Sequence, residues 1–179
     1  MKNNKIFVCL LCIFGFLSLA TIIHADYVLP YPSYMPGNKL YKVSRILDIL
    51  ENYWNFGAVA QTKFHLELAD KYLVEAKTLF EYKQYLLATD ALNRSDNQFS
   101  SLPVHLVSVK NEGVDTTQLH QTIQEAAVKH TDVLEALLAV TPVTFNWTPE
   151  KSQPTMLDVH ALIQQAIAIR SSVSGAIKN

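Results

Sequence analysis

Histidines are the residues of this sequence most suited to holding a metal, because no cysteine occurs after position 12. Metal ligands on helices occur as Glu-x-x-His or as two histidines four residues apart, since these spacings place both side chains on one face. Neither spacing occurs here. The sequence therefore predicts no metal site and no cofactor, with histidines at the surface or the core edge. These histidines are His65, His105, His120, His130 and His160.

Two pairs of carboxylates have the three-residue spacing that places side chains on one helix face. Asp48 and Glu51 form one pair, and Glu67 and Asp70 form the other. Such pairs suit acid–base work, but neighbouring lysines favour ion pairs exposed to solvent. The sequence contains neither Gly-x-Ser-x-Gly nor Ser-x-x-Lys, which are typical of activated serines. We therefore expect no catalytic residues and a protein that is not an enzyme.

The first 25 residues have the pattern of a secretory signal peptide. Lys2 and Lys5 precede an apolar run over residues 6–23, and Ala25 provides a small residue at the cleavage position. Cleavage before Asp26 would place the protein outside the cytoplasm, secreted or at the cell envelope. The alternative is an uncleaved N-terminal membrane anchor, because about 18 apolar residues are at the lower limit for spanning a bilayer.

The remaining 154 residues are enough for one domain with a substantial core, but few for two. Without the two leader lysines, the chain has 13 basic and 16 acidic residues and no run of like charge. This balance predicts neither nucleic acid nor an anionic membrane surface as a partner. Both cysteines, Cys9 and Cys12, lie in the leader, so the processed chain would have no disulfide.

Residues 26–38 are predicted to form an extended segment, because Pro30, Pro32 and Pro36 prevent a helix there. Three tyrosines alternate with these prolines and are the candidate interaction residues: Tyr27, Tyr31 and Tyr34. Two arrangements remain open. The segment either packs as a strap over the helices that follow it, or is displayed as a polyproline-like ligand for another protein.

Residues 39–179 are predicted to form an all-α domain, an antiparallel bundle of four to five helices. Apolar residues recur at spacings of three and four within each helical segment, and no strand pattern is evident. Pro103 indicates one kinked helix or two abutting ones, and residues 142–154 are expected to form an irregular connection before a last helix from about Thr155. The residues predicted to face the core are Leu40, Val43, Leu47, Leu50 and Trp54; Leu66, Ala69, Leu73, Ala76 and Phe80; Ala88, Leu92, Ser95, Phe99, Leu102, Leu106 and Val109; Leu119, Ile123, Ala126, His130, Val133, Leu137 and Val140; and Met156, Val159, Ile163, Ala166, Val173 and Ile177.

Several segments resemble a family of uncharacterised bacterial exported helical domains, common in candidate-phylum bacteria. The resemblance rests on an LPYPSYMPG segment followed by NKLYKVSRILDIL, then TKFHLELADKYLVEA and YKQYLLATDAL, and it extends to a helix around Lys129 and His130. Such proteins have a leader, a Leu-Pro-rich segment and Ala/Leu-rich helices. The resemblance implies export and a helical fold, and it implies no activity and no catalytic residues.

Together these observations favour a non-catalytic protein-interaction or structural module at the cell envelope. The partner is expected to be an envelope or extracellular protein, and the membrane becomes a partner only if the leader is retained. The alternative function is a carrier that binds a small ligand or a metal inside the bundle. The sequence does not determine the oligomeric state.

Overall fold

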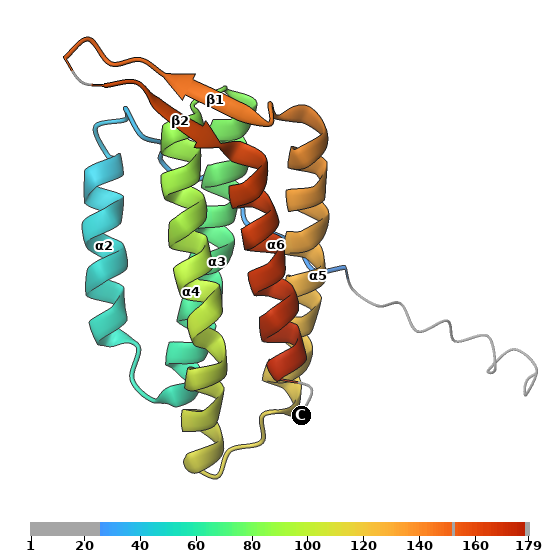
Figure 1. Ribbon diagram of the computed structural model, residues 1–179. Helices are drawn as coiled ribbons and strands as arrows, with labels where there is room; N and C mark the ends of the chain where they lie inside the picture. Colours follow the sequence, from blue (N-terminus) through green and yellow to red (C-terminus); the bar gives the residue numbers. More distant parts are fainter. Residues whose placement is uncertain (1–25, 152, 178–179) are drawn as a thin grey trace, which may run out of the picture.

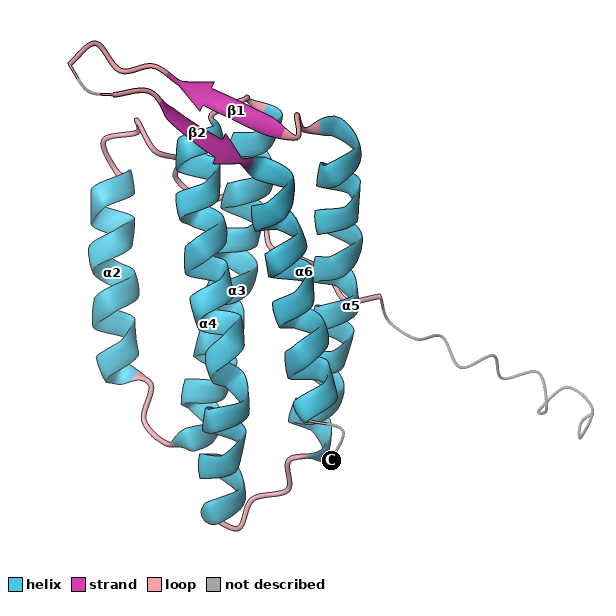
Figure 2. Cartoon of the chain, viewed as in Figure 1, coloured by secondary structure: helices cyan, strands magenta, loops and turns pink. Residues whose placement is uncertain are grey.

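A computed structural model describes residues 26–151 and 153–177, and the predicted signal peptide lies outside these residues. Five helices run along one axis, and a short hairpin crosses one end of the bundle (Figures 1 and 2). The prediction of an all-α bundle is confirmed. The elements are α2 (Tyr41–Trp54), α3 (Ala58–Glu81), α4 (Tyr85–Asn111), α5 (Thr117–Val140), β1 (Thr144–Trp147), β2 (Thr155–Asp158) and α6 (Val159–Ala176).

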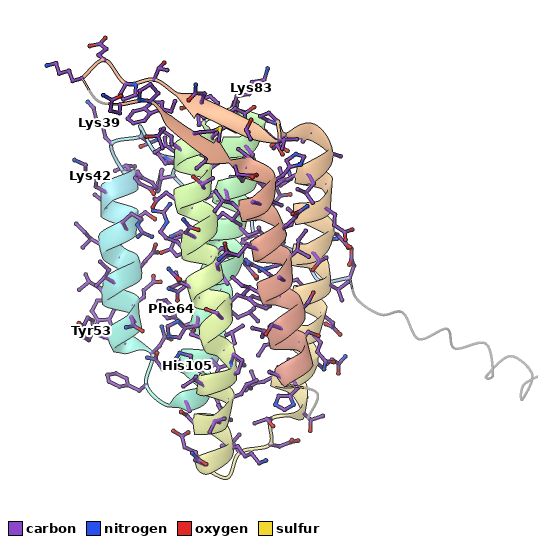
Figure 3. The ribbon with its side chains drawn as sticks, viewed as in Figure 1. Lys39, Lys42, Tyr53, Phe64, Lys83 and His105 are labelled. Atoms are coloured by element: carbon purple, nitrogen blue, oxygen red, sulfur yellow. The ribbon has the colours of Figure 1, made fainter. Side chains whose placement is uncertain are left out.

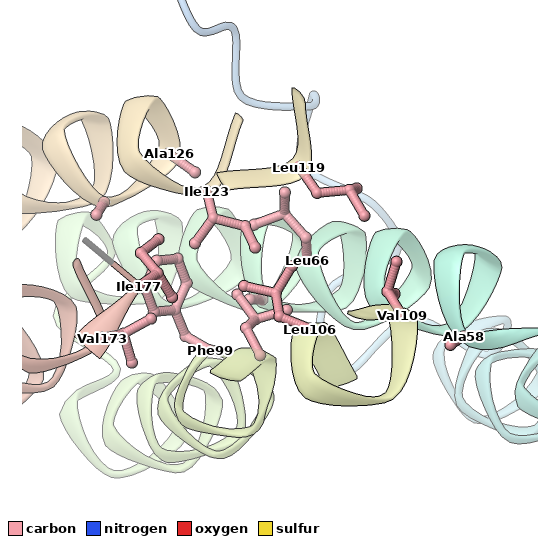
Figure 4. Packing of buried hydrophobic residues seen from close by; sticks show 13 residues of the cluster. Ala58, Leu66, Phe99, Leu106, Val109, Leu119, Ile123, Ala126, Val173 and Ile177 are labelled. Atoms are coloured by element: carbon pink, nitrogen blue, oxygen red, sulfur yellow. The ribbon is translucent and has the colours of Figure 1, made fainter. Parts of the chain in front are cut away.

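The core is built by α3, α4, α5 and α6, whose apolar stripes meet on the bundle axis. It divides into two clusters of buried side chains. The cluster far from the hairpin includes Phe99, Leu106, Ile123 and Val173, whose side chains meet between the helices (Figure 4). The cluster beside the hairpin contains Leu73, Ala76, Leu79, Phe80, Ala88, Ala91, Leu92, Leu134, Leu137, Val159, Ile163 and Ala166. Among the positions predicted to face the core in these four helices, Val140 is exposed and Val133 is half-buried, and the others are buried.

Helix α4 runs unbroken through Pro103, so the prediction is resolved in favour of a single helix rather than two. Proline removes one hydrogen bond of the helix, but the flanking residues Leu102 and Leu106 are buried against the other helices. Their burial offsets the lost bond and explains why the helix continues.

The prediction that the chain from 142 to 154 is irregular, with no strand, is wrong. Thr144–Trp147 pairs with Thr155–Asp158 in an antiparallel hairpin, and the last helix begins at Val159 rather than near Thr155. Asp158 caps that helix by accepting a hydrogen bond from the backbone N–H of Ala161 at 2.9 Å. Met156, predicted to face the core, lies in β2 and is exposed.

The prediction for the first helix is also wrong in its orientation. Helix α2 forms where expected, but the apolar residues predicted to face the core are exposed to solvent, and Asp48 is its buried residue. These exposed residues are Leu40 at the N-cap and Val43, Leu47, Leu50 and Trp54 in the helix. The helix lies at the outer edge of the bundle, next to α3 and α4 (Figure 1). The aromatic residues at this helix end, Tyr53, Trp54 and Phe56, are largely exposed as well.

Residues 26–35 follow the bundle without helix or strand, and turns over 36–40 then lead into α2, so the predicted extended segment ends about three residues early. Tyr27 packs against the cluster far from the hairpin, and Leu29 and Met35 pack against the other cluster. None of the described helices is sufficiently long and apolar to cross a membrane.

Candidate functional site

A layer of polar side chains crosses the middle of the bundle, between the two apolar clusters. Each of the four core helices contributes to it: Asp70 from α3, Ser95 and Asp96 from α4, His130 from α5 and Arg170 from α6. All five side chains are buried. A buried charge is costly unless it is paired. The contacts within this polar layer therefore determine whether any of its groups is free to bind a ligand or to react.

Arg170 is the centre of the polar layer and is fully buried. Its Nη1 donates to Oδ1 of Asp96, and its Nη2 donates to the hydroxyl of Ser95 at 2.7 Å. Its guanidinium also lies 5.2 Å from the centre of the Phe99 ring, which places an aromatic face against the charge. Burial raises the pKa of Asp96, and the neighbouring guanidinium opposes that rise. Arg170 and Asp96 therefore form an ion pair that is satisfied within the protein.

His130 links Arg170 to Asp70. Nε of Arg170 lies 3.5 Å from Nδ1 of His130, and Nε2 of His130 lies 2.7 Å from Oδ1 of Asp70. A guanidinium can only donate, so Nδ1 accepts, and the proton of the neutral ring is on Nε2 and points to Asp70. Burial lowers the pKa of His130, which favours this neutral form. His130 is thus fully buried, as its place among the residues predicted to face the core indicates, rather than at the surface or the core edge, and neither ring nitrogen is free for a ligand.

Tyr27, from the extended segment, completes the layer at its edge. Its hydroxyl donates to Oδ2 of Asp70 at 2.6 Å, so Asp70 accepts from a tyrosine on one oxygen and a histidine on the other. Burial and the adjacent carboxylate raise the pKa of Tyr27, which keeps the hydroxyl protonated. One residue earlier, Asp26 pairs with Lys129 at 3.1 Å. The polar layer thus holds the start of the extended segment against the bundle.

A second polar region joins α2 to the bundle. Asp48 accepts from Lys71 at 2.5 Å and from the hydroxyl of Tyr72 at 3.0 Å. Nearer the start of α2, the hydroxyl of Tyr41 donates to Glu75 at 2.9 Å and accepts from Arg94 at 3.0 Å. Four residues of α2 therefore face α3 and α4 and are polar or part polar: Tyr41, Ser44, Arg45 and Asp48.

The opposite side of α2 is apolar and faces away from the bundle. We call it the outer face of α2, made of Val43, Ile46, Leu47, Leu50 and Trp54, with Ile49 and Tyr53 on its flank. The five residues expose between 41% and 68% of their surface. Figure 3 shows the side chains that α2 directs away from the other helices, between Lys42 and Tyr53. An amphipathic helix normally turns its apolar side to the core, and α2 does the reverse.

A cavity of about 250 Å³ lies between α2 and the bundle. Aromatic rings line it, among them Phe64 (labelled in Figure 3) and Tyr72. Among the described side chains, two buried nitrogens have no hydrogen-bond partner, Nη1 of Arg45 and Nε of Arg94, and both residues line this cavity. The cavity therefore offers two guanidinium N–H groups without hydrogen-bond partners beside aromatic walls, while both arginines are ion-paired, Arg45 with Asp48 at 4.0 Å and Arg94 with Glu75 at 2.8 Å.

The remaining candidates from the sequence are placed as follows. Tyr31 is almost fully exposed and Tyr34 half exposed, so only Tyr27 is hydrogen-bonded to the core. His65 and His105 stack with ring centres 4.1 Å apart, and burial, with the neighbouring His65, lowers the pKa of His105. Nε2 of His160 bonds the carbonyl of Thr141 at 3.0 Å. Among residues 26–151 and 153–177, no group of three or more metal-ligating side chains is present.

The prediction of solvent-exposed carboxylate pairs is wrong for one member of each pair. Asp48 and Asp70 are buried, whereas Glu51 and Glu67 are exposed. Sequence reasoning also missed Asp96 and Arg170 as core residues. The available signal was position: Arg170 lies four residues after Ala166 and three before Val173, within the apolar stripe of α6.

The profile of a family described as a domain of unknown function, DUF5667, matches residues 33–144. The chain belongs to this family. The matched segment includes α2 to α5, so both the outward-facing helix and three of the four helices of the polar layer lie within it. No curated protein and no solved structure matches the chain. The resemblance to a family of uncharacterised helical domains is confirmed, while bacterial origin and export stay predictions.

Proposed function

We propose that this DUF5667 protein is a non-catalytic interaction module at the cell envelope, which binds another protein chain through the outer face of α2. The observation that carries the proposal is the orientation of α2, whose apolar residues face solvent while its polar residues face the bundle. Exposed apolar surface of this extent marks interaction sites in soluble proteins. A partner helix with an apolar stripe would bury this face.

A catalytic role has less support because the buried titratable groups are committed to one another. Asp70, His130 and Arg170 use their polar atoms within the polar layer, and the extended segment covers its edge through Tyr27. Such a layer positions the helices and the extended segment. It gives no attacking group a free path to a substrate.

Site-specific photo-crosslinking in producing cells tests the proposal. A photo-reactive amino acid at Leu50 is expected to form an adduct with a protein, and the same amino acid at Val104, an exposed apolar position on α4, is expected to form none. The variant Ile46→Ser/Leu50→Ser should keep the melting temperature of the parent. A large fall in melting temperature, or equal adducts at both positions, would contradict the proposal.

The second candidate function is a small-ligand carrier, favoured by the cavity under α2 rather than by the bundle interior. Its two guanidinium N–H groups without hydrogen-bond partners, from Arg45 and Arg94, and its aromatic walls suit a small aromatic carboxylate, which would compete with Asp48 and Glu75 for these arginines. Titration with benzoate, followed by NMR shifts of Tyr72 and Phe64, tests this function. Saturable shifts that Arg45→Gln abolishes would support it, and unchanged spectra would exclude this class of ligand.

A further inference from the structure

We propose that the outer face of α2 binds the same face of a second copy of this chain, with the two α2 helices antiparallel across a two-fold axis. This inference rests on the proposed function, because it names the partner of that same face. Self-association requires only that one face be complementary to itself, and two-fold dimers are the commonest protein assemblies.

The size of the face fits a dimer. Helix α2 has 14 residues, so it is about 21 Å long. The five residues of the outer face each expose two fifths or more of their surface. Covering them would remove about 500 Å² of apolar surface from each copy, at roughly 100 Å² for a half-exposed large side chain. A standard interface buries about 800 Å² per partner, so these five residues supply more than half of what a stable dimer needs.

The order of large and small residues along α2 fits the antiparallel orientation. A two-fold axis that crosses the helix between positions 48 and 49 brings Val43 level with Trp54 of the second copy, and Leu47 level with Leu50. The smallest side chain of the outer face then meets the largest one. In a parallel pair, Trp54 would instead meet Trp54 while two small Val43 side chains leave space between the helices at the other end.

The charges beside the outer face support the same orientation. Lys42 and Glu51 are exposed on α2. In the antiparallel pair Lys42 lies level with Asn55 of the second copy, and Glu51 lies level with Ile46. In a parallel pair Lys42 would lie level with Lys42 of the second copy, and Glu51 level with Glu51. Like charges at one level are unfavourable. The antiparallel pair also opposes the two helix dipoles.

The position of α2 leaves this face accessible. The helix is at the outer edge of the bundle, and the extended segment and the other helices lie on its other sides or at its ends (Figure 1). The contacts of Asp48 and Tyr41 hold α2 to its own bundle while its outer face binds the second copy. A dimer therefore needs no rearrangement of the monomer.

Sedimentation equilibrium of the exported chain, purified as the cell processes it, tests the inference over a hundred-fold range of concentration. The parent protein is expected to have the mass of a dimer, and Leu47→Glu/Leu50→Glu the mass of a folded monomer whose melting temperature equals that of the parent diluted to the monomer. The matched control Val104→Glu/Val107→Glu places the same charges on exposed apolar positions of α4 and should remain a dimer. A monomeric parent at every concentration would overturn the inference.

Disulfide trapping tests the orientation independently. No cysteine occurs after residue 12, so in the processed chain an introduced cysteine can form a disulfide only with another introduced cysteine. Val43→Cys/Trp54→Cys is expected to give a covalent dimer on oxidation, whereas each single variant gives none. Covalent dimers from the single variants would indicate a parallel pair and overturn the antiparallel arrangement.

The failure of the dimer and the failure of the proposed function are distinguishable. If the parent is monomeric and the photo-reactive amino acid at Leu50 still forms an adduct with a different protein, the second copy is refuted and the interaction module stands. If the parent is monomeric and instead binds vesicles of anionic phospholipid, and Leu47→Glu/Leu50→Glu abolishes that binding, the face docks on a membrane, and both the second copy and a protein partner are refuted. If Leu47→Glu/Leu50→Glu instead unfolds the monomer, the face packs within its own chain. In that case both the dimer and the interaction module are refuted.

Discussion

The bundle interior and the interface of α2 use the same residue types in opposite ways. Between α3, α4, α5 and α6, apolar side chains fill the interior and one polar layer interrupts them. Between α2 and the bundle, polar contacts form the interface and the apolar side chains face solvent. The comparison shows that burial of an apolar stripe holds four helices together, whereas hydrogen bonds and ion pairs position the fifth.

The first difference to test is the role of charge in the interior. Arg170→Met leaves the buried carboxylate of Asp96 without its partner, and we expect a loss of about 3–5 kcal/mol in the free energy of unfolding. Adding Asp96→Asn removes the unpaired charge and should recover part of that loss. Urea unfolding of both variants measures the effect, and equal stability of the single and double variants would contradict it.

The second test applies one substitution type to both regions. Leu92→Ala creates a cavity in the cluster beside the hairpin and should cost about 2–5 kcal/mol, because Leu92 is 1% exposed. Leu47→Ala removes the same atoms from the outer face of α2, where the expected change is within about 0.5 kcal/mol. Both are compared by urea unfolding at low protein concentration. A loss above 2 kcal/mol for Leu47→Ala would show that the outer face is part of the monomer core.

The sequence predicts most of the bundle because, in α3 to α6, the apolar residues that recur at helical spacing are the residues that are buried. Leu66, Leu73, Phe99 and Ile123 are buried as their spacing indicates. The same reasoning places α2 correctly along the chain but orients it wrongly. Periodicity shows which residues share a face, and it does not show which face turns to the bundle.

The candidate site is less predictable, since its contacts join residues far apart in sequence. Tyr27 and Asp70 are 43 residues apart, and Arg170 and Asp96 are 74 apart. A charged residue such as Arg170 within an apolar stripe is usually assigned to the surface, because arginine is rarely fully buried. The four-residue strands were missed because so few residues give no measurable alternation.

The third test concerns the attachment of the extended segment. Tyr27→Phe keeps the ring but removes the hydroxyl that donates to Asp70, and leaving one oxygen of a buried carboxylate without a donor should cost about 1–3 kcal/mol. Tyr31→Phe is the matched control, because Tyr31 is almost fully exposed, and its change should stay within about 0.5 kcal/mol. Thermal unfolding measures both. Equal melting temperatures would mean that the segment does not depend on the polar layer.

The smallest expected effect is the pH dependence of the polar layer. Burial lowers the pKa of His130 in the folded state below its unfolded value of about 6.5. The unfolded chain therefore binds a proton that the folded chain does not, so the free energy of unfolding falls as pH decreases below about 6.5. One proton gives a slope of at most about 1.4 kcal/mol per pH unit.

The variant His130→Gln isolates that slope. Its amide can donate to Asp70 and accept from Arg170, as the neutral imidazole does, but it does not titrate. The raised pKa of Asp96 acts in the opposite direction, because the folded carboxyl holds its proton to higher pH and so favours the folded state in acid. Asp96 is present in both proteins, so its contribution cancels in the difference between them. Urea unfolding of parent and variant from pH 8 to pH 5 should show the parent losing stability more steeply below about pH 6.5. Parallel curves would mean that folding does not lower the pKa of His130, so that the ring becomes an imidazolium near pH 6.5 and its Nδ1 cannot then accept from Arg170.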